Sequence, residues 1–474
     1  MSVEGVPRGR QGEVLAAELR RRITDGTLAC GVHLPSSRRL AADLGVSRGV
    51  VVAVYEQLTA EGHLSSAPGS GTSVAERSTA TSARSAPVIE VAPVAGMNPG
   101  QPDPALFPRH AWQRAAQRAM AALPDSAFLY GDARGHLPLR CELVSYLGRT
   151  RSILTDPDRI VVTNGFAQCL NLLVQTLLRR TGRAVIAVED PGSAGASAQL
   201  SWLGAEVVPV PVDAHGLDVE ALARTAAQAV IVTPAHQYPT GVPLAAERRH
   251  QLVEWAEATG GLIVEDDYDA EYRYDRAPLT SLHALAPQRV IAAGSVSKSL
   301  GPALRIGWAV VPDHLVADVA AAKANADLGN SVISQATLAE FIATGALDRH
   351  LRRSRTIYRQ RRDRLIAALE AAPGVAVTGI AAGLHLVLEL PEPCDAAALA
   401  DVARRAGFAA QPLDRYRHRP GSPGVVLGYA PLTVDAIDHA AQTLVDAITE
   451  PASKRSRPPA RRRRDQAGSP TVRT

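Results

Sequence analysis

Six short apolar runs in the middle of the chain restrict the possible folds more than any other feature. Each run is rich in aliphatic residues, and segments with helical spacing separate them. Strands that alternate with helices favour a mainly parallel sheet covered by helices, so we expect an α/β domain over 96–450. From about residue 345 the pattern predicts a smaller α+β subdomain. The runs are AVIAVE at 184–189, AEVVPV at 205–210, AVIVTP at 229–234, GLIVED at 261–266, RVIAAG at 289–294 and IGWAVV at 306–311.

The bulk properties are those of a soluble protein with more than one domain. The 474 residues exceed what one hydrophobic core usually organises, and 46% hydrophobic with 21% charged residues is an ordinary globular composition. No apolar stretch approaches the ~20 residues of a membrane span, and the first residues lack the apolar core of a secretory signal. The four cysteines have neither metal-site nor disulfide spacing. We therefore predict a cytoplasmic protein with no membrane association and no bound metal.

The net charge of +4 is unevenly distributed. Residues 451–474 hold eight Lys or Arg and one Asp, and residues 1–75 carry +1, which leaves −4 for 76–450. The large central region is therefore not expected to bind nucleic acid. The basic tail, 451–474, is predicted to be disordered; it either adds sequence-independent DNA affinity or is a solvated extension.

The N-terminal 75 residues have the pattern of three helices followed by a two-stranded hairpin. Helical spacing begins at 11–25, and the segment 34–62 reads as helix, tight turn, helix, with Gly45 in the turn. Ser36 or Ser37 is expected to cap the second helix, and Ser47 the third. Residues 76–95 are rich in Ser, Thr, Ala and Pro and are predicted to be a linker.

The exposed polar residues of this pattern suggest contacts with double-stranded DNA. Ser47 and Arg48 stand at the start of the third helix, where a recognition helix meets bases or phosphates. The remaining candidates are Arg38 and Arg39 at the start of the second helix, and Gly69 and Gly71 at the tip of the hairpin. The alternative is a small helical bundle whose arginines are simply solvated.

The segment resembles the winged helix of the GntR family of bacterial regulators. The resemblance rests on LPSSRRLA at 34–41, LGVSR at 44–48, Tyr55, Glu61–Gly62 and the glycines of the hairpin. Val50 departs from it, because family members often have Thr there.

A second group of residues has the composition of a cofactor site. Lys298 follows Ser295 and Ser297, and Arg305 comes seven residues later. Asp266 and Tyr268 end a buried-looking strand, and the segment Gly165, Phe166, Ala167 and Gln168 follows the strand RIVVTN and opens a helix. A lysine amine, a carboxylate, a phenol and a phosphate-binding helix start are the parts that pyridoxal phosphate requires. Each part alone is more often a solvated lysine or a surface acidic turn.

The central region resembles fold-type I aminotransferases, and together with the winged helix it resembles the MocR branch of GntR regulators. The matching motifs are GQPDPALFPRHAW at 100–112, YGDARGHLPLR at 130–140, VTNGFAQ at 162–168, VEDPG at 188–192, TPAHQYPTG at 233–241, EDDYDAEYRY at 265–274, SVSKSLGPALRIGW at 295–308 and AGLHL at 382–386.

The resemblance implies a role for each candidate. Lys298 would form the Schiff base, Asp266 would pair with the ring nitrogen, and Tyr268 would contact the ring oxygen. The phosphate would be held by Ser295, Ser297, Arg305 and the amides of Gly165, Phe166, Ala167 and Gln168. Tyr130 would reach the phosphate of the neighbouring subunit, which implies a head-to-tail homodimer that presents two winged helices to paired operator half-sites.

Two departures concern turnover. Ser193 stands where relatives commonly stack an aromatic ring on the cofactor, and Val426 stands where amino-transferring relatives place a carboxylate-binding Arg. Without these contacts an amino acid is poorly oriented for proton abstraction. Alternatively, another arginine takes over from a loop: Arg355, Arg415, Arg417 or Arg419.

We therefore expect a transcriptional regulator in which pyridoxal phosphate on Lys298 modulates operator binding. The effector is either pyridoxal phosphate itself, with control of vitamin B6 synthesis, or an amino compound that forms an external aldimine. The competing hypothesis is an active aminotransferase with a vestigial DNA-binding module.

Overall fold

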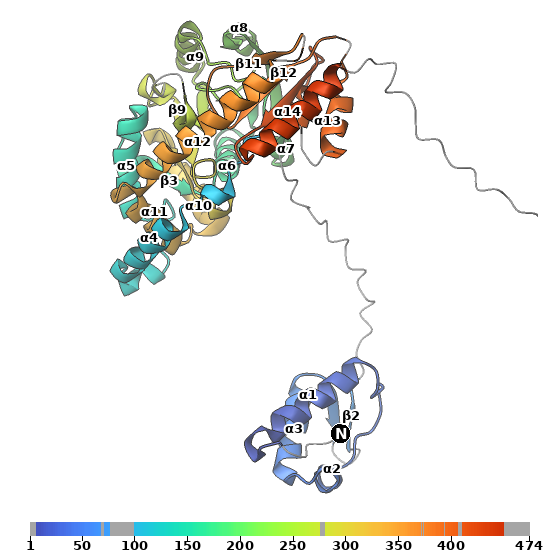
Figure 1. Cartoon of the computed structure of the whole chain (residues 1–474). Helices are drawn as coiled ribbons and strands as arrows, with labels where there is room; N and C mark the ends of the chain where they lie inside the picture. Colours follow the sequence, from blue (N-terminus) through green and yellow to red (C-terminus); the bar gives the residue numbers. More distant parts are fainter. Residues whose placement is uncertain are drawn as a thin grey trace, which may run out of the picture. The chain divides into compact units, whose positions relative to one another are not determined.

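The computed structural model describes residues 6–67, 71–75, 99–274, 280–370, 372, 374–392, 394–405 and 410–449. The chain divides into two compact units, residues 1–92 and 93–474, which are described separately (Figure 1). The predicted linker at 76–95, Gly69 and the basic tail at 451–474 lie outside the described residues.

The first unit is a winged helix-turn-helix, as predicted. Its elements are α1 (Gln11–Thr24), α2 (Ser37–Leu44), α3 (Arg48–Ala60), β1 (Leu64–Ala67) and β2 (Gly71–Val74). The Ser36 hydroxyl accepts a hydrogen bond from the Arg39 amide at the start of α2, and Ser47 does the same for Val50 at the start of α3. Gly45 ends α2 with φ of +65°, a conformation that favours glycine.

The core of this unit lies between the three helices and the hairpin. Val51, Val54, Tyr55 and Leu58 form the buried face of α3, whereas Val50 is only half-buried. The other core residues are Leu15, Ala16, Leu19, Ile23, Leu40, Ala41, Leu64 and Val74.

The second unit is built on an eight-stranded sheet with the order β3-β10-β9-β8-β7-β4-β5-β6. Its strands are β3 (Ile160–Thr163), β4 (Val185–Asp190), β5 (Glu206–Asp213), β6 (Gly216–Leu217), β7 (Ala229–Val232), β8 (Leu262–Asp266), β9 (Val290–Ser295) and β10 (Gly307–Val310). Strands β5, β4, β7, β8 and β9 pair in parallel, whereas β10 is antiparallel to both β9 and β3. The carboxyl ends of β3, β4, β7, β8 and β9 therefore meet at one edge.

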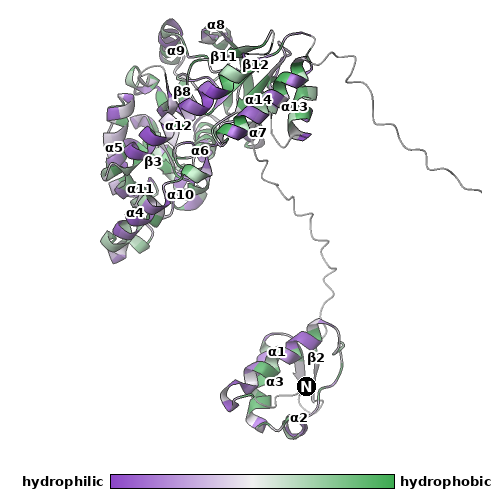
Figure 2. Cartoon of the chain, in the orientation of Figure 1, coloured by the Kyte–Doolittle hydropathy of each residue, from purple (hydrophilic) through white to green (hydrophobic). Residues whose placement is uncertain are grey.

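Helices cover both faces of this sheet (Figure 1). Apolar residues of α6, α7 and α10 pack on one face, and those of α8 and α9 pack on the other. Helices α4, α5, α11 and α12 form a further core with the β3 side of the sheet. Figure 2 shows that α5 and α12 carry both hydrophilic and hydrophobic residues along their length, as expected for helices that bury one face. Their bounds are α4 (Arg109–Ala122), α5 (Leu137–Arg151), α6 (Phe166–Thr181), α7 (Ala194–Trp202), α8 (Val219–Ala223), α9 (Ala246–Thr259), α10 (Asp313–Asp327), α11 (Val332–Ala343) and α12 (Ala346–Leu369).

The predicted smaller α+β subdomain is also present. Four antiparallel strands in the order β11-β12-β14-β13 pack against helices α13 and α14 and the end of α12. The elements are β11 (Ala376–Thr378), β12 (His385–Glu389), α13 (Ala396–Arg405), β13 (Ala410–Pro412), β14 (Gly424–Gly428) and α14 (Val434–Thr449). Within the described residues, no helix has the length and apolarity needed to cross a membrane.

Leu58→Ala should destabilise the winged helix without affecting the second unit. Leu58 is fully buried, and removing a buried leucine side chain typically costs about 2–5 kcal/mol. All four tryptophans lie between residues 112 and 308, so their fluorescence reports on the second unit alone. In a urea titration followed by circular dichroism, the helix content of the variant should begin to fall at a lower urea concentration than that of wild type. The midpoint of the tryptophan fluorescence transition should not change. The exposed control Glu56→Ala should change neither signal; a shift of the tryptophan transition in Leu58→Ala would contradict independent unfolding.

Candidate functional site

A cavity of about 370 Å³ lies at the edge where the parallel strands end. Its wall is formed by the residues that end or follow β4, β7, β8 and β9 and by the first turn of α6. Open α/β sheets commonly bind ligands at this edge. The lining residues are Pro99, Gly100, Phe166, Ala167, Val188, Glu189, Ser193, Ala196, Ile231, Thr233, Tyr238, Asp266, Tyr268, Ser295, Ser297, Lys298, Pro302 and Arg305.

Lys298 places a partly desolvated amine in this cavity. Burial lowers the pKa of Lys298 below its usual value, although the carboxylates of Asp266 and Asp269 oppose the shift. Gly100 confines the amine from one side, because a Cβ atom there would lie 3.3 Å from the Lys298 Nζ atom. A lowered pKa leaves more of the amine uncharged and able to attack a carbonyl carbon.

Too little positive charge lies near the Asp266 carboxyl group to offset the effect of its burial. Burial, together with the neighbouring carboxylate of Asp267, raises the pKa of Asp266 to about 8, and Lys298 only partly opposes this. The part of Asp266 that is not buried lines the cavity. A ligand that brings a protonated ring nitrogen to this place would supply the missing positive partner.

The end of the cavity beside α6 is suited to an anion. Arg305 adopts a left-handed conformation, with φ of +52°, and its guanidinium donates to the carbonyl oxygen of Asn164. A Cβ atom at Gly165 would lie 3.3 Å from the Arg305 Nη2 atom, so glycine allows this close packing. Phe166 and Ala167, the first residues of α6, line the cavity, and the N-terminus of a helix favours negative charge.

Gln168 is oriented away from this end, contrary to the prediction that its amide holds phosphate. Its backbone amide donates to the carbonyl oxygen of Gly165, 3.0 Å away, within the first turn of α6. Its side-chain amide donates to Asp327, with an N–O distance of 2.7 Å. Of the segment 165–168, only Phe166 and Ala167 line the cavity.

The hydroxyl group of Tyr268 is held in place by the buried pair His236 and Asp269. Its hydroxyl lies 3.0 Å from the His236 Nδ1 atom and 3.0 Å from the His236 carbonyl oxygen. His236 Nδ1 is also 3.0 Å from a carboxylate oxygen of Asp269. Burial, with the nearby negative charge of Asp269, raises the pKa of Tyr268 well above its usual value, so the phenol remains protonated.

Val426, which the sequence analysis named as a departure from amino-transferring relatives, lies in an apolar cluster. Val426 packs against Val387, Leu413 and Tyr416, with Tyr238 at the margin of the cluster. Ser193 lines the cavity, but its hydroxyl accepts a hydrogen bond from Ala196 at the start of α7.

None of the four alternative arginines lines the cavity. Arg355 donates to the carbonyl oxygen of Glu271, and Arg417 to that of Ser422, each at 2.8 Å. Arg415 borders a separate pocket beside Cys394, and Arg419 is exposed.

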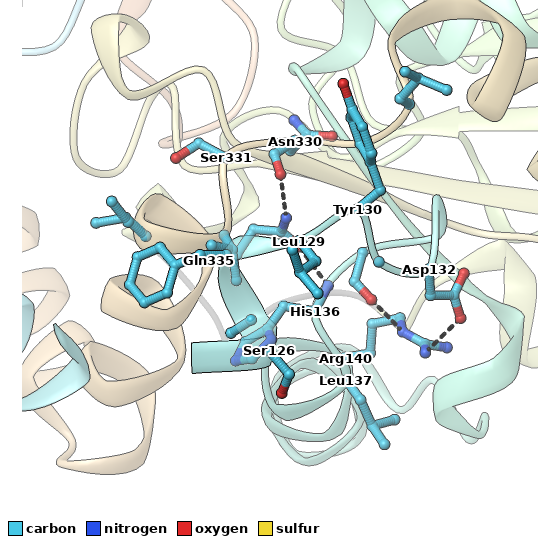
Figure 3. A pocket seen from close by; sticks show the side chains of 18 of the residues that line it. Ser126, Leu129, Tyr130, Asp132, His136, Leu137, Arg140, Asn330, Ser331 and Gln335 are labelled. Carbon is cyan, nitrogen blue, oxygen red and sulfur yellow. Dashed lines mark hydrogen bonds and ion pairs between the residues drawn. The ribbon is translucent and has the colours of Figure 1, made fainter. Parts of the chain in front are cut away.

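Tyr130 lies outside the cavity, in an open groove of about 1090 Å³ on the same unit. The side chain of Tyr130 is 88% exposed and projects from the segment that carries Leu129 (Figure 3). Other exposed apolar side chains that line the groove are Phe128, Leu137, Leu328 and Ile333.

The candidate DNA-contact residues lie at the surface of the winged helix. Arg38, Arg39, Ser47, Arg48 and Gly71 are all exposed. The acidic residues near α1 are paired with other arginines: Glu61 with Arg20, and Glu18 with Arg21 and Arg22. Within residues 6–67 and 71–75, no ion pair engages Arg38, Arg39 or Arg48, so these guanidinium groups are available to phosphate.

The structure thus brings eight of the eleven predicted cofactor residues to one cavity. Gly165 packs behind Arg305, whereas Gln168 and Tyr130 are directed elsewhere. Gly100, Glu189, Thr233 and Tyr238 were not assigned to the site from the sequence, although they stand in motifs that the sequence analysis quotes. No motif identifies Glu189 and Thr233 as site residues, because they reach the cavity through their positions at the carboxyl ends of parallel strands.

The sequence comparisons agree with this architecture. Residues 11–74 match the family described as "Bacterial regulatory proteins, gntR family", and residues 94–444 match "Aminotransferase class I and II". A pyridoxine biosynthesis transcriptional regulator, PdxR of Corynebacterium glutamicum, is 36% identical over 445 residues, which cover 92% of this chain and 95% of that protein. The chain belongs to the MocR-type GntR regulators. The predicted family and fold are confirmed.

Other relatives of this MocR-type regulator include both regulators and enzymes. The probable rhizopine catabolism regulatory protein MocR of Rhizobium meliloti is 33% identical, and the match covers 90% of each chain. Among solved structures, the kynurenine aminotransferase of Pyrococcus horikoshii superposes with a TM-score of 0.68 at 29% identity, over 74% of this chain and 89% of that one. The α-aminoadipate aminotransferase LysN of Thermus thermophilus gives a TM-score of 0.66 at 28% identity, over 74% and 90% of the two chains.

Glu189→Gln should stabilise the cofactor-free MocR-type chain more at high pH than at low pH. One Glu189 oxygen accepts hydrogen bonds from the Thr233 amide and hydroxyl and from Gln237. Burial nevertheless raises the pKa of Glu189 from 4.5 to about 7. A carboxyl group whose pKa is raised by folding destabilises the native state as pH rises through the window from the unfolded to the folded pKa.

The free energy of unfolding in urea should therefore be higher for Glu189→Gln than for wild type by an amount that grows by about 2 kcal/mol between about pH 5.5 and pH 8. The exposed Glu254→Gln on α9 is the matched control and should be insensitive to pH. A constant difference between Glu189→Gln and wild type would mean that Glu189 is charged in the native protein.

Proposed function

We propose that this MocR-type regulator senses pyridoxal phosphate in the cavity at the sheet edge and changes its binding to operator DNA in response. The observation that carries the proposal is the position of Lys298, a half-buried amine with a lowered pKa between the Asp266 carboxyl group and the start of α6. The chain has only two other lysines, Lys323 and Lys454, against 48 arginines. Lysine is therefore rare in this chain, and one of its three lysines lines the cavity.

The residues of the cavity fit pyridoxal phosphate at each end. Lys298 would hold its aldehyde carbon, Asp266 would face its ring nitrogen, and the Tyr268 phenol would lie near its ring oxygen. Its phosphate would be bound by Arg305, Ser295, Ser297 and the first amides of α6. When bound, the cofactor supplies an electrophilic carbon and a ring that withdraws electrons.

The cavity is better suited to binding than to transamination. An amino-acid substrate brings a carboxylate, and a carboxylate without a cationic partner is costly to bury. The apolar cluster at Val426 offers no such partner, and Ser193 provides no ring for stacking. The active aminotransferase is the second candidate, favoured by the retained Lys298 and Asp266 and by the likeness to aminotransferase structures.

Pyridoxal phosphate itself is the proposed effector, which links the protein to vitamin B6 synthesis. The missing carboxylate clamp argues against an amino-acid ligand, and the relative from Corynebacterium glutamicum is named as a regulator of pyridoxine biosynthesis. An amino compound that binds through the cofactor remains the competing effector.

A second copy of the chain is the proposed occupant of the groove at Tyr130. Leu129, Tyr130 and Leu328 are 74%, 88% and 58% exposed, and large apolar side chains gathered in this way are typical of protein interfaces. In a head-to-tail homodimer, Tyr130 would reach the phosphate in the partner's cavity. Two winged helices would then face paired half-sites.

The proposed organisation assigns DNA binding to 1–75, a linker to 76–95, cofactor binding to 96–450 and a basic tail to 451–474. DNA contact would involve Arg38, Arg39, Ser47, Arg48 and the hairpin with Gly69 and Gly71. A regulator of this kind acts on chromosomal DNA, so we place it in the cytoplasm.

Lys298→Ala should abolish covalent pyridoxal phosphate binding and the response of DNA binding to the cofactor. Wild type should gain the visible absorbance of a Schiff base, and borohydride reduction followed by peptide mapping should place the label on Lys298. A shift assay on the chain's own upstream DNA should respond to pyridoxal phosphate in wild type and in Lys454→Ala, the matched control, but not in Lys298→Ala. An unaltered response in Lys298→Ala would overturn the proposal. Conversion of bound cofactor to its amine form by amino acids would favour the aminotransferase.

Arg48→Ala should weaken operator binding and lower its dependence on salt. An exposed arginine at the start of a recognition helix contributes about one phosphate contact or one base contact. Anisotropy titrations of operator and scrambled duplexes at several salt concentrations distinguish the two. If affinity falls for both duplexes and the slope of log affinity against log salt concentration becomes smaller by about one, Arg48 contacts a phosphate. If affinity falls for the operator alone, Arg48 contacts a base. Arg10→Ala, an exposed change in the same unit, should leave both titrations unchanged; equal effects of the two variants would exclude a specific role for Arg48.

A further inference from the structure

One carboxylate, Asp327 at the end of α10, receives four hydrogen bonds. One of its oxygens accepts from the side-chain amides of Asn164 and Gln168, at 3.1 and 2.7 Å. The other accepts from the Lys323 amine at 2.5 Å and the Gly329 amide at 2.9 Å. Burial would raise the pKa of Asp327, but the hydrogen bonds from Gln168 and Lys323 outweigh it and lower this pKa. The group is therefore a charged, fully engaged carboxylate.

The first oxygen fixes the anion-binding end of the cavity. Asn164 and Gln168 lie on either side of Gly165, Phe166 and Ala167, the segment that opens α6. The carbonyl oxygen of Asn164 also accepts from Arg305, and the backbone amide of Asn164 donates to the Gln168 side-chain oxygen at 2.8 Å. Asp327 thus holds the helix start and, through Asn164, the arginine that faces the same end.

The second oxygen fixes one wall of the groove. Leu328 has φ of +59° and Gly329 has φ of +113°, so the chain turns sharply just after Asp327. The hydrogen bond from the Gly329 amide to Asp327 closes this turn and presents Leu328, which is 58% exposed, to the groove. A non-glycine residue in the left-handed region persists only where its surroundings hold it.

A second path joins the same two places. The Asn330 side-chain amide donates to the Asn164 side-chain oxygen at 2.6 Å, and Gln335 donates to the Asn330 carbonyl oxygen at 3.0 Å. The His136 amide then donates to the Gln335 side-chain oxygen at 2.7 Å. Asn330, Gln335 and His136 all line the groove near Tyr130 (Figure 3).

We propose that Asp327 is a positioning residue that couples phosphate binding in the cavity to association of two chains at the groove. The proposal rests on the proposed function, which supplies both the phosphate-bearing ligand and the partner chain. A phosphate that orders Arg305 and the start of α6 also orders Asn164. Asp327 transmits this order to Leu328, and Asn164 transmits it directly to Asn330. Coupling between two binding events is reciprocal, so chain association also strengthens phosphate binding.

The ordinary alternative is that Asp327 only ends α10 and neutralises the buried Lys323. In that case its replacement lowers stability but affects ligands with and without phosphate equally. A comparison of pyridoxal phosphate with pyridoxal separates the two explanations, because both carry the aldehyde and the ring and only one carries phosphate.

The main test is Asp327→Asn in the full-length chain, titrated by absorbance with pyridoxal phosphate and with pyridoxal. We expect affinity for pyridoxal phosphate to fall by about tenfold, whereas affinity for pyridoxal changes less than about twofold. The matched control is Asp318→Asn on the same helix, whose carboxylate pairs with Arg180 at the surface at 2.7 Å. It should change neither affinity. Equal losses for both ligands in Asp327→Asn would overturn the positioning role.

The coupling itself is tested by the rate at which labelled and unlabelled chains exchange partners. Pyridoxal phosphate should slow exchange of wild type by about fivefold or more, and that of Asp327→Asn by less than about twofold. Inorganic phosphate alone should slow wild-type exchange if the phosphate group is sufficient, and a wild-type response to pyridoxal as large as that to pyridoxal phosphate would contradict the proposal. Asn330→Ala, which cuts the second path and leaves the Lys323–Asp327 pair intact, keeps the coupling testable if Asp327→Asn is poorly folded, and should also reduce the effect of the cofactor on exchange.

The results separate this inference from the proposed function. Wild type that binds pyridoxal phosphate on Lys298 and forms dimers, but exchanges partners at the same rate with and without it, overturns the coupling alone. Wild type that neither binds the cofactor nor associates overturns the proposed function and the coupling together.

Discussion

The parallel pairing of β4, β7, β8 and β9 is the constraint on which the rest of the large unit depends. Parallel strands need a crossover between them, and each crossover returns the chain to the same end of the sheet. The carboxyl ends therefore collect side chains that are far apart in sequence, among them Glu189, Asp266 and Lys298. The small subdomain contacts this edge, since the amides of Gly192 and His418 bond to the Tyr416 carbonyl oxygen and the Asp190 carboxylate at 2.8 Å. Burial at this place shifts the pKa values of the three groups, so their chemistry follows from the topology.

Local features of this chain could be predicted from the sequence, and features that depend on distant partners could not. The caps at Ser36 and Ser47 and the turn at Gly45 need only neighbouring residues, and all three are present. The strands are equally local, since each is a short aliphatic run. Gln168 illustrates the limit, because its side chain bonds to Asp327, a residue 159 positions away that no spacing rule connects to it. Glu189 was overlooked for the same reason: its acidic motif was visible, but its position beside Thr233 arises from the pairing of β4 with β7.

The apolar cluster around Val426 gives the departure at this position a structural meaning. Val387, Leu413 and Tyr416 fill the place beside Val426, and Tyr238 connects this cluster to the cavity wall. Inserting a guanidinium there would require its charge to be buried among apolar side chains, which is costly without a partner. The packing around Val426 therefore excludes a cation from this place. The cavity thus contains the Lys298 amine, the Asp266 carboxyl group and the start of α6, but the cluster beside Val426 offers no cation to orient a substrate carboxylate.

A regulator of this design has to convert occupancy of a small cavity into a change elsewhere in the molecule. A ligand shifts such an equilibrium only by the difference between its affinities for the two arrangements. Attachment of a ligand to Lys298 alone would give only a small difference in affinity between the two arrangements. Lys298 follows the end of β9, and this strand is fixed by pairing on both sides. The phosphate end is different, since the start of α6 and Arg305 are held by side chains that also form the wall of the groove. The phosphate is also the group that distinguishes the active vitamer from its precursor pyridoxal. The proposed coupling at the phosphate end would therefore make the response selective for the phosphorylated form of the ligand.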